Sequence, residues 1–139
     1  MSCAKSATGT KALSRVVIDA SALLALVQGE TGGQNVLPHL PHAVMSAVNY
    51  CETVQRLRRG GMPIESVTMA VTRLVPEPMV FDKEAAYVTA AMHEKTRGQG
   101  ISFADCACLA LALMLGVPAL TAERKWDQCD VGVQVIRIR

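Results

Sequence analysis

The sequence predicts an α/β domain with a mostly parallel sheet. Short β-branched or apolar runs of strand length alternate along the chain with longer segments of helical periodicity. Glycine, proline or a capping Ser or Asp marks most of the boundaries between them. A chain of 139 residues, half of them apolar, is long enough for one domain with a sizeable core. Strands and helices in this order are typical of parallel sheets joined by crossover helices.

The first unit is a buried β-branched strand over residues 16–18 that ends at Asp19. We expect Ser21 to cap a helix over residues 21–28, which Gly29 ends. Open α/β sheets bind ligands beyond the carboxyl ends of their strands, and Asp19 follows such an end directly. The alternative is that Asp19 only helps to cap the helix.

The second unit comprises a short helix over residues 33–39, a strand over residues 43–45 and a helix that Ser46 caps and that runs to residue 59. At 100° per residue, the apolar side chains of the last helix share one face. They are Ala47, Tyr50, Cys51, Val54 and Leu57. The opposite, polar face carries Asn49, Glu52, Arg56 and Arg59. Glu52 is therefore a candidate site residue, and the alternative is an ordinary i,i+4 pair with Arg56 worth about 0.2–0.5 kcal/mol.

The third unit is a helix that begins at Pro63 and runs to residue 74, followed by a strand over residues 79–81. Prolines at positions 76 and 78 separate the two. Asp82 then caps a helix that continues to residue 95.

The helix predicted over residues 102–115 is apolar on every face, so we expect it to be buried. Asp105 is its only charged residue. Ser102 and Asp105 have the spacing of a capping box, and the positive end of the helix dipole also favours a carboxylate there. A purely structural Asp105 is therefore the alternative to a functional one. Beyond Gly116 we expect a strand over residues 117–121, a turn with one helical turn over residues 122–127 and a fifth strand over residues 131–138.

Composition limits the possible functions. Aromatic residues make up 4% of the chain, too few for a protein that binds single strands by stacking bases. A net charge of +2 does not by itself indicate a nucleic-acid partner. Basic residues gather at positions 56, 58 and 59 and again at 124 and 125, and we interpret both groups as solvated helix ends. No apolar run reaches the length of a membrane span.

The five cysteines predict free thiols in a reducing cytoplasm, since their number is odd and no CxxC occurs. Cys106 and Cys108 point about 200° apart on their helix, so they cannot share a metal, and we expect both to be buried. Residues 1–14 lack the apolar segment of a signal peptide. We expect them to be a disordered leader, an expression remnant or the result of an early start codon, ahead of a domain over residues 15–139.

Four carboxylates, on Asp19, Glu52, Asp105 and Glu123, are placed toward the edge of the sheet where parallel strands end. At about 5 Å from one another, each pair would repel by roughly 3 kcal/mol at an effective dielectric constant near 20. Such a group persists only if some members are protonated or a cation neutralises them. Hard oxygen ligands without Cys or His select Mg²⁺ or Mn²⁺, and a metal held in this way can activate water against a phosphate.

Four segments together resemble the PIN-domain family, and within it most closely the VapC-type toxins of prokaryotic toxin–antitoxin pairs. They are Val-Ile-Asp-Ala-Ser-Ala-Leu-Leu from position 17, Ser-Ala-Val-Asn-Tyr-Cys-Glu-Thr-Val from 46, Ile-Ser-Phe-Ala-Asp-Cys from 101 and Leu-Thr-Ala-Glu-Arg from 120. The resemblance extends from Val16 to the C-terminus. Each segment alone is weak evidence, but four in the right order at normal intervals are strong.

The resemblance implies a three-layer α/β/α sandwich with a five-stranded sheet in the order 3-2-1-4-5, which leaves Asp82 on an outer strand as a cap. It implies a Mg²⁺- or Mn²⁺-dependent ribonuclease, a homodimer and a cognate antitoxin whose tail fills the acidic groove. The acidic site maps onto Asp19, Glu52, Asp105 and Glu123, as metal ligands and catalytic residues, with Ser21, Asn49 and Thr121 supporting them. Glu123 departs from the more common Asp of the family, and Asp127 is a possible substitute for it.

Two other functions remain open. A phosphoacceptor signalling domain of flavodoxin-like fold also gathers acids around Mg²⁺, but it needs a tight acidic pair after the first strand, and Asp19 has no acidic neighbour. A PIN-like domain that has lost catalysis and serves as a binding module is the second, and the departure at Glu123 favours it.

Overall fold

The computed structural model describes residues 15–75 and 77–139. The residues expected to form the leader therefore lie outside the described part. In chain order the elements are β1 (Val16–Ile18), α1 (Ala20–Val27), η1 (Gly33–His42), β2 (Ala43–Val44), α2 (Ala47–Arg59), α3 (Ile64–Leu74), α4 (Lys83–Lys95), α5 (Phe103–Leu115), β3 (Ala119–Thr121), η2 (Arg124–Gln128) and β4 (Val135–Arg137), where η denotes a 3₁₀ helix.

The four strands form one parallel sheet in the order β2-β1-β3-β4. β1 occupies the centre, with the next strand in sequence on one side and the later strands on the other. The point at which the strand order reverses therefore lies between β1 and β3, beside the carboxyl ends of both. This is where an open α/β sheet places its ligand site. The predicted α/β class and the predicted arrangement around the first strand are confirmed.

The predicted strand over residues 79–81 is wrong. Only Met79 reaches the sheet, through a single parallel bridge to Ser46 just beyond β2. Its amide donates to the carbonyl of Met45, and its carbonyl accepts from Ala47. Pro78 has no N–H group to donate, and Val80 is 80% exposed, so neither neighbour extends the ladder. The segment keeps the position expected for the outer strand, but the described sheet has four strands rather than five.

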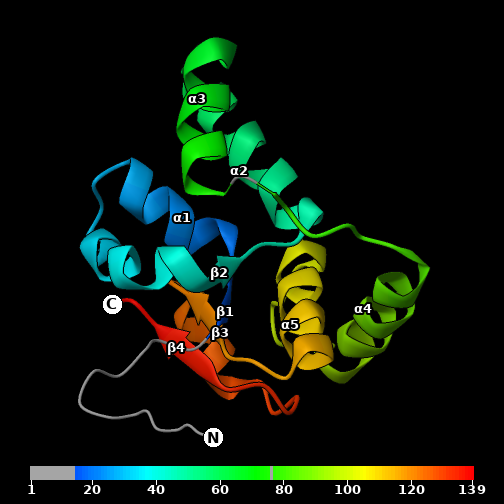
Figure 1. Ribbon diagram of the computed structural model, residues 1–139. Coiled ribbons are helices and arrows are strands. Elements are labelled where there is room, and N and C mark those ends of the chain that lie inside the picture. Colours follow the sequence, from blue (N-terminus) through cyan, green and yellow to red (C-terminus); the bar gives the residue numbers. More distant parts are fainter. Residues whose placement is uncertain (1–14, 76) are drawn as a thin grey trace, which may run out of the picture.

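Helices cover both faces of the sheet, which gives the predicted three layers (Figure 1). The central strand shows this directly, because its side chains alternate between two apolar clusters. Val16 and Ile18 pack with residues of α1, η1, α2 and α3, whereas Val17 packs with residues of α4, α5 and η2. α5 is buried along most of its length, from Asp105 to Ala112, as its apolar sequence predicts.

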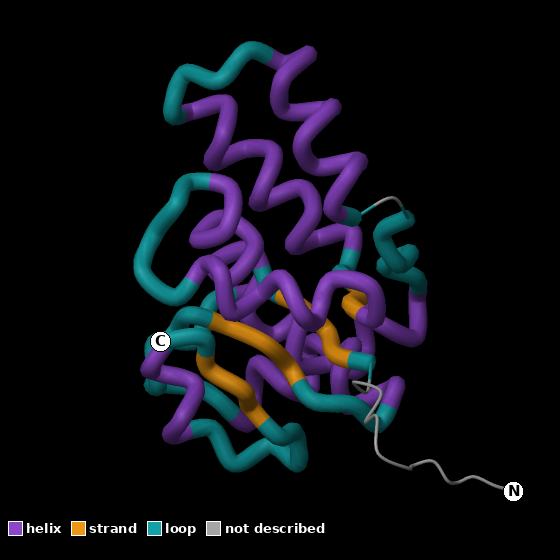
Figure 2. Tube along the Cα trace, turned by 60° about the vertical axis from the view of Figure 1, so that its left-hand side comes forward, coloured by secondary structure: helices purple, strands orange, loops and turns teal. Residues whose placement is uncertain are grey.

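α2 and α3 form a hairpin that extends away from the sheet, as both views show (Figures 1 and 2). Gly60 and Gly61 make the turn between them, Gly61 with a φ of 98°. The buried face of α2 differs from the prediction. Asn49, Thr53 and Leu57 are buried, whereas Cys51 is exposed. α2 packs against α1 and α5 as well as α3, so its inward face is set by three neighbours rather than by its apolar residues alone.

Several boundaries also differ from the sequence-based expectation. Residues 33–42 form a 3₁₀ helix rather than a short α-helix, with Pro38 and Pro41 inside it. Pro63 caps α3 rather than forming its first residue. Within the described ranges, no helix is both long and apolar enough to cross a bilayer.

Gly33 provides a test of how η1 lies against α1. A Cβ at this position would collide with the backbone carbonyl of Ala25. We expect Gly33→Ala to lower the free energy of unfolding by about 1–3 kcal/mol, because the backbones must separate. The matched control is Gly60→Ala, whose Cβ would lie 3.5 Å from the nearest carbonyl oxygen. Urea denaturation measures both, and equal stabilities of the two variants would contradict the prediction.

Candidate active site

Asp19 is the innermost acid of the site and is 2% exposed. It is the N-cap of α1, because its Oδ1 accepts a hydrogen bond from the amide of Ala22 at 2.9 Å. The expectation that Ser21 caps this helix is therefore wrong. The hydroxyl of Ser21 instead donates to the carboxylate of Asp19 at 2.9 Å and accepts from the amide of Ala122 at 3.0 Å.

Thr121, the last residue of β3, completes the surroundings of Asp19. Its hydroxyl donates to Oδ2 of Asp19 at 2.7 Å and accepts from the amide of Glu123 at 3.0 Å. The side chains of Ser21 and Thr121 thus connect the end of β1 to the end of β3 through the carboxylate. The role predicted for both residues, as groups that support an acidic ligand, is consistent with these contacts.

Burial raises the pKa of Asp19 from 3.8 to about 7. Hydrogen bonds from Ala22, Thr121 and Ser21 act in the opposite direction but are outweighed, and the negative charge of Asp105 raises the pKa further. Near neutral pH the carboxyl group of Asp19 is therefore divided between its two protonation states. A cation at this position would favour the ionised state.

Asp105 lies at the start of α5 and is 9% exposed. The predicted capping box is present, since the amide of Ser102 donates to Oδ2 of Asp105 at 2.9 Å and the amide of Asp105 donates to the hydroxyl of Ser102 at 3.1 Å. Structural capping is not its only interaction, because the ammonium group of Lys125 lies 3.3 Å from the same Oδ2. Asp105 therefore stabilises the helix and also presents charge toward the residues that follow β3.

Glu52 extends from α2 and makes the predicted i,i+4 pair with Arg56, at 3.4 Å. The charge of Glu52 acts on the same buried thiol as the charges of Asp19 and Asp105. The thiol of Cys108 is buried, and its pKa is raised well above the ordinary value, first by burial and then by Asp19, Asp105 and Glu52. The charges of three acids thus act on one buried group from three places in the fold: the N-terminus of α1, α2 and α5.

Asn49 fixes α2 against the first turn of α5. Its side-chain amide donates to the carbonyl of Ala104 at 3.0 Å, and the residue is 1% exposed. Its Oδ1 has no hydrogen-bond partner within the described residues. A buried acceptor without a partner is costly, so Oδ1 is available to a donor or a metal-bound water near Asp105.

Glu123 follows β3 and lies at the rim of the site. Its carboxylate is 3.9 Å from the ammonium group of Lys125. Asp127, the predicted substitute, is turned toward β4, where its carboxylate pairs with Arg137 at 3.2 Å. Of the two, only Glu123 shares a cation with Asp105.

Within residues 15–75 and 77–139, no three Asp, Glu, His or Cys side chains lie close enough together to enclose a metal ion. The donor set is nevertheless of the kind that Mg²⁺ and Mn²⁺ prefer, because it consists of carboxylates and hydroxyls. Lys125 places one positive charge between Asp105 and Glu123, where a cation is favoured. The chemistry of the donors fits a hard divalent ion, but the acids are not grouped around one point in this geometry, and Lys125 pairs with two of them.

Lys125 is the group that the sequence analysis missed. It was interpreted as part of a solvated helix end, yet it pairs with two of the four candidate acids. Its position two residues after Glu123 was the available signal. Its pairing with Asp105, twenty positions earlier, depends on how η2 lies against α5.

Comparisons with known proteins agree with the fold. A family model described as PIN domain matches residues 16–132. Ribonuclease VapC42 of Mycobacterium tuberculosis is 32% identical, with 84% of this chain and 96% of the relative covered. The VapC ribonuclease Mb2780c of Mycobacterium bovis matches to the same extent.

Solved structures share the fold at lower sequence identity. The DNA-bound VapBC of Salmonella typhimurium has a TM-score of 0.72 at 13% identity and covers 91% of this chain and 100% of that chain. A toxin–antitoxin complex from Klebsiella pneumoniae has a TM-score of 0.71 at 15% identity and covers 89% and 98%. At these identities the likeness concerns the fold.

The raised pKa of Asp19 predicts how stability depends on pH without metal. Between about pH 4 and pH 7 the folded protein keeps a proton on Asp19 that the unfolded chain has lost. The free energy of unfolding therefore falls as the pH rises through this window, by about 1.4 kcal/mol for each unit of the pKa shift. Chemical denaturation in EDTA should show that wild type and Asp19→Asn diverge with pH in this way. Parallel pH profiles of the two proteins would contradict the prediction.

Proposed function

This chain belongs to the PIN-domain family, among relatives of the VapC ribonucleases, and on that basis we propose that it is a ribonuclease toxin of a type II toxin–antitoxin pair. The observation that supports the proposal is that Asp19 ends the strand beside the point where the strand order reverses and lies near enough to Asp105 for the charge of Asp105 to raise its pKa. Glu52 also acts on the buried thiol that both aspartates influence, and Glu123 shares Lys125 with Asp105. The proposed reaction is hydrolysis of an RNA phosphodiester bond.

We assign the acids distinct roles toward a bound Mg²⁺ or Mn²⁺. Asp19 and Asp105 would hold the main metal, and Glu123 would support a second one. When bound, such a metal supplies an activated water and neutralises charge on the phosphate. Ser21 and Thr121 fix the orientation of the Asp19 carboxylate through their hydroxyl groups. Glu52 is less buried than the two aspartates, with 26% of its side chain exposed, and orients the attacking water.

Lys125 occupies the charge position that a metal would take beside Asp105. Its side chain is 37% exposed and flexible, so it can leave for solvent at small cost. In the metal-free protein it limits the repulsion between Asp105 and Glu123. We propose that metal loading displaces it.

The remaining features of the proposal concern partners and compartment. The solved structures of similar fold include toxins bound to their antitoxins, which supports a cognate antitoxin for this chain. We further propose a homodimer whose acidic groove receives the antitoxin tail. The described cysteines, Cys51, Cys106, Cys108 and Cys129, are free thiols, in keeping with a reducing cytoplasm.

A binding module without catalysis is the second candidate. The observation that favours it is the pairing of two of the four acids with Lys125 and the separation of the acids in the metal-free geometry. Calorimetric titration with Mn²⁺ distinguishes the two, because the binding module is expected to bind no divalent ion.

The catalytic assignment predicts a graded series of activities on single-stranded RNA. Asp105→Asn should lower kcat/KM by at least about 100-fold, since a charge that acts on the reacting centre is lost. Glu123→Gln should lower it by about 10-fold. Asp127→Asn is the matched control and should retain wild-type activity, because that carboxylate faces Arg137. Circular dichroism confirms folding, and full activity of folded Asp105→Asn would exclude the assignment.

Lys125 gives a prediction for metal affinity that does not depend on activity. Lys125→Met removes the competing ammonium group, so Mn²⁺ should bind about five- to tenfold more tightly, in line with an ion pair worth about 1 kcal/mol. Lys83→Met, at the exposed start of α4, is the control for the change in net charge. Isothermal titration calorimetry measures both, and an unchanged affinity in Lys125→Met would show that the ammonium group does not compete.

A further inference from the structure

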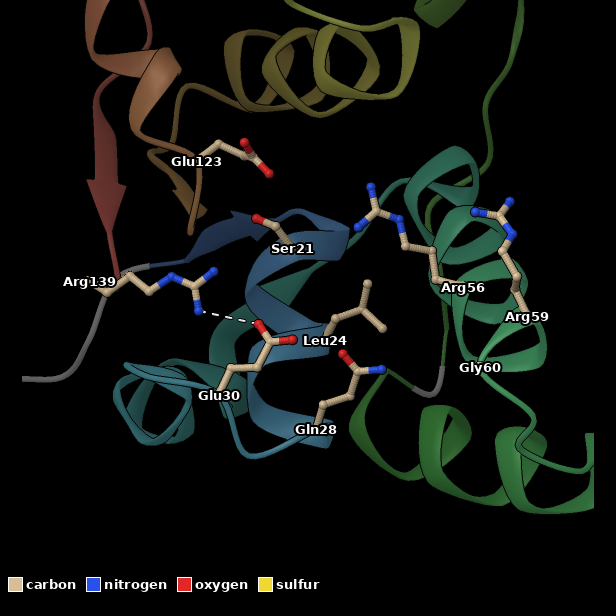
Figure 3. Close-up of a pocket in the computed structure, with 9 residues that line it drawn as sticks. All are labelled: Ser21, Leu24, Gln28, Glu30, Arg56, Arg59, Gly60, Glu123 and Arg139. Carbon is tan, nitrogen blue, oxygen red and sulfur yellow. Dashed lines mark hydrogen bonds and ion pairs between the residues drawn. The ribbon is translucent and has the colours of Figure 1, made fainter.

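A pocket of about 420 Å³ lies between α1 and α2, and one of the candidate acids, Glu123, lines it. Ser21 and Glu123 line one part of it, which connects it to the carboxylate of Asp19 through the hydroxyl of Ser21. Arg56 and Arg59 line the wall formed by α2 (Figure 3). The pocket therefore extends from Glu123 and Ser21, beside the buried carboxylate of Asp19, to two arginines on one helix.

The charges of this pocket are not balanced. Arg139 pairs with Glu30 at 3.3 Å, and this pair lies across α1 from the arginines of α2 (Figure 3). Arg56 has Glu52 at 3.4 Å, but half of its side chain is exposed and its other donors are open. Arg59 has no carboxylate within ion-pair distance in the described part of the chain. Among the described residues, the α2 wall thus offers one guanidinium group without a paired carboxylate, that of Arg59, and a second, that of Arg56, which is paired only with Glu52.

The chemistry of this wall indicates its ligand. Guanidinium groups bind phosphate through paired, planar hydrogen bonds. Arg56 and Arg59 are three residues apart, so they extend from the same face of α2 with about 5–6 Å between their Cβ atoms. No aromatic residue lines the pocket, and its one large apolar residue is Leu24. It therefore suits a charged backbone rather than a stacked base.

We propose that Arg56 and Arg59 bind the RNA backbone phosphates next to the scissile one, which lies at the acids. This inference rests on the proposed ribonuclease function. Four carboxylates repel a polyanion, and the arginine wall supplies attraction at the far end of the same pocket. Arg56 also contacts Glu52, so one guanidinium group connects a candidate catalytic acid to the bound strand.

Arg58 supplies a matched control on the same helix. It lies between the two arginines in sequence, is exposed, and donates to the carbonyl of Met62 at 3.2 Å, and it does not line the pocket. Arg58→Gln and Arg59→Gln remove the same charge from the same turn of α2. A difference in RNA affinity between the two variants therefore reflects the position of the arginine rather than the loss of one positive charge.

The test measures binding of a fluorescent single-stranded RNA oligonucleotide by anisotropy between 50 and 200 mM salt, in an Asp105→Asn background that prevents cleavage. We expect Arg59→Gln to weaken binding about five- to tenfold and to lower the slope of log K against log[salt] by about 0.7, the loss of one phosphate contact. Arg58→Gln should leave both unchanged. In the active protein, Arg59→Gln should raise KM for the same RNA with little change in kcat.

Two outcomes would overturn the inference while leaving the ribonuclease function intact. In the first, the protein cleaves RNA but Arg59→Gln keeps the wild-type KM and salt slope. In the second, Arg58→Gln and Arg59→Gln lose RNA affinity equally. Failure of the proposed function gives a different result, since the parent protein then neither binds nor cleaves RNA. A polyglutamate peptide that binds to the parent but not to Arg59→Gln, without any RNA binding, would assign the pocket to an acidic protein segment instead.

Discussion

The burial of one carboxylate, that of Asp19, imposes the main constraint on this structure. A buried carboxylate needs hydrogen-bond donors, and two segments provide three of them. The first turn of α1 contributes the amide of Ala22 and the hydroxyl of Ser21, and the end of β3 contributes the hydroxyl of Thr121. The two strands that flank the reversal point are therefore joined by side chains at their carboxyl ends as well as by their backbones. Because the effect of burial exceeds that of these hydrogen bonds, the pKa of Asp19 stays raised. A positive charge near the carboxylate would stabilise its ionised form.

The stabilising effect of positive charge near the acids accounts for the arrangement of the other charged residues. Asp105 adds negative charge near Asp19, Glu52 and Glu123 add it at the rim, and a basic side chain accompanies each cluster of acids. Lys125 lies between Asp105 and Glu123, and Arg56 lies beside Glu52. In the metal-free geometry, local cations thus limit a repulsion that a divalent ion would otherwise neutralise.

Sequence reasoning predicted the features that depend on local chemistry. The caps Ser46 and Asp82, the box of Ser102 with Asp105 and the pair of Glu52 with Arg56 all involve residues within four positions of each other, so their spacing specifies them. The strand at residues 79–81 failed because an apolar pattern does not show how many of its residues find a partner in a distant strand, and here only Met79 does. The inward face of α2 and the pairing of Lys125 with Asp105 failed because both depend on packing between distant segments. The assignment of all four acids as metal ligands stays a prediction.

α2 carries both Glu52 and the arginine wall, and it continues into the hairpin that extends from the sheet (Figure 2). A helix is stiff over 13 residues, so the spacing between Glu52 and these arginines is set by helical geometry and does not vary. Their placement relative to Asp19 has a different origin, because it depends on how α2 packs against α1 and α5. A small rotation of α2 as a rigid helix would therefore move the carboxylate of Glu52 and both guanidinium groups together, toward or away from the buried carboxylate of Asp19.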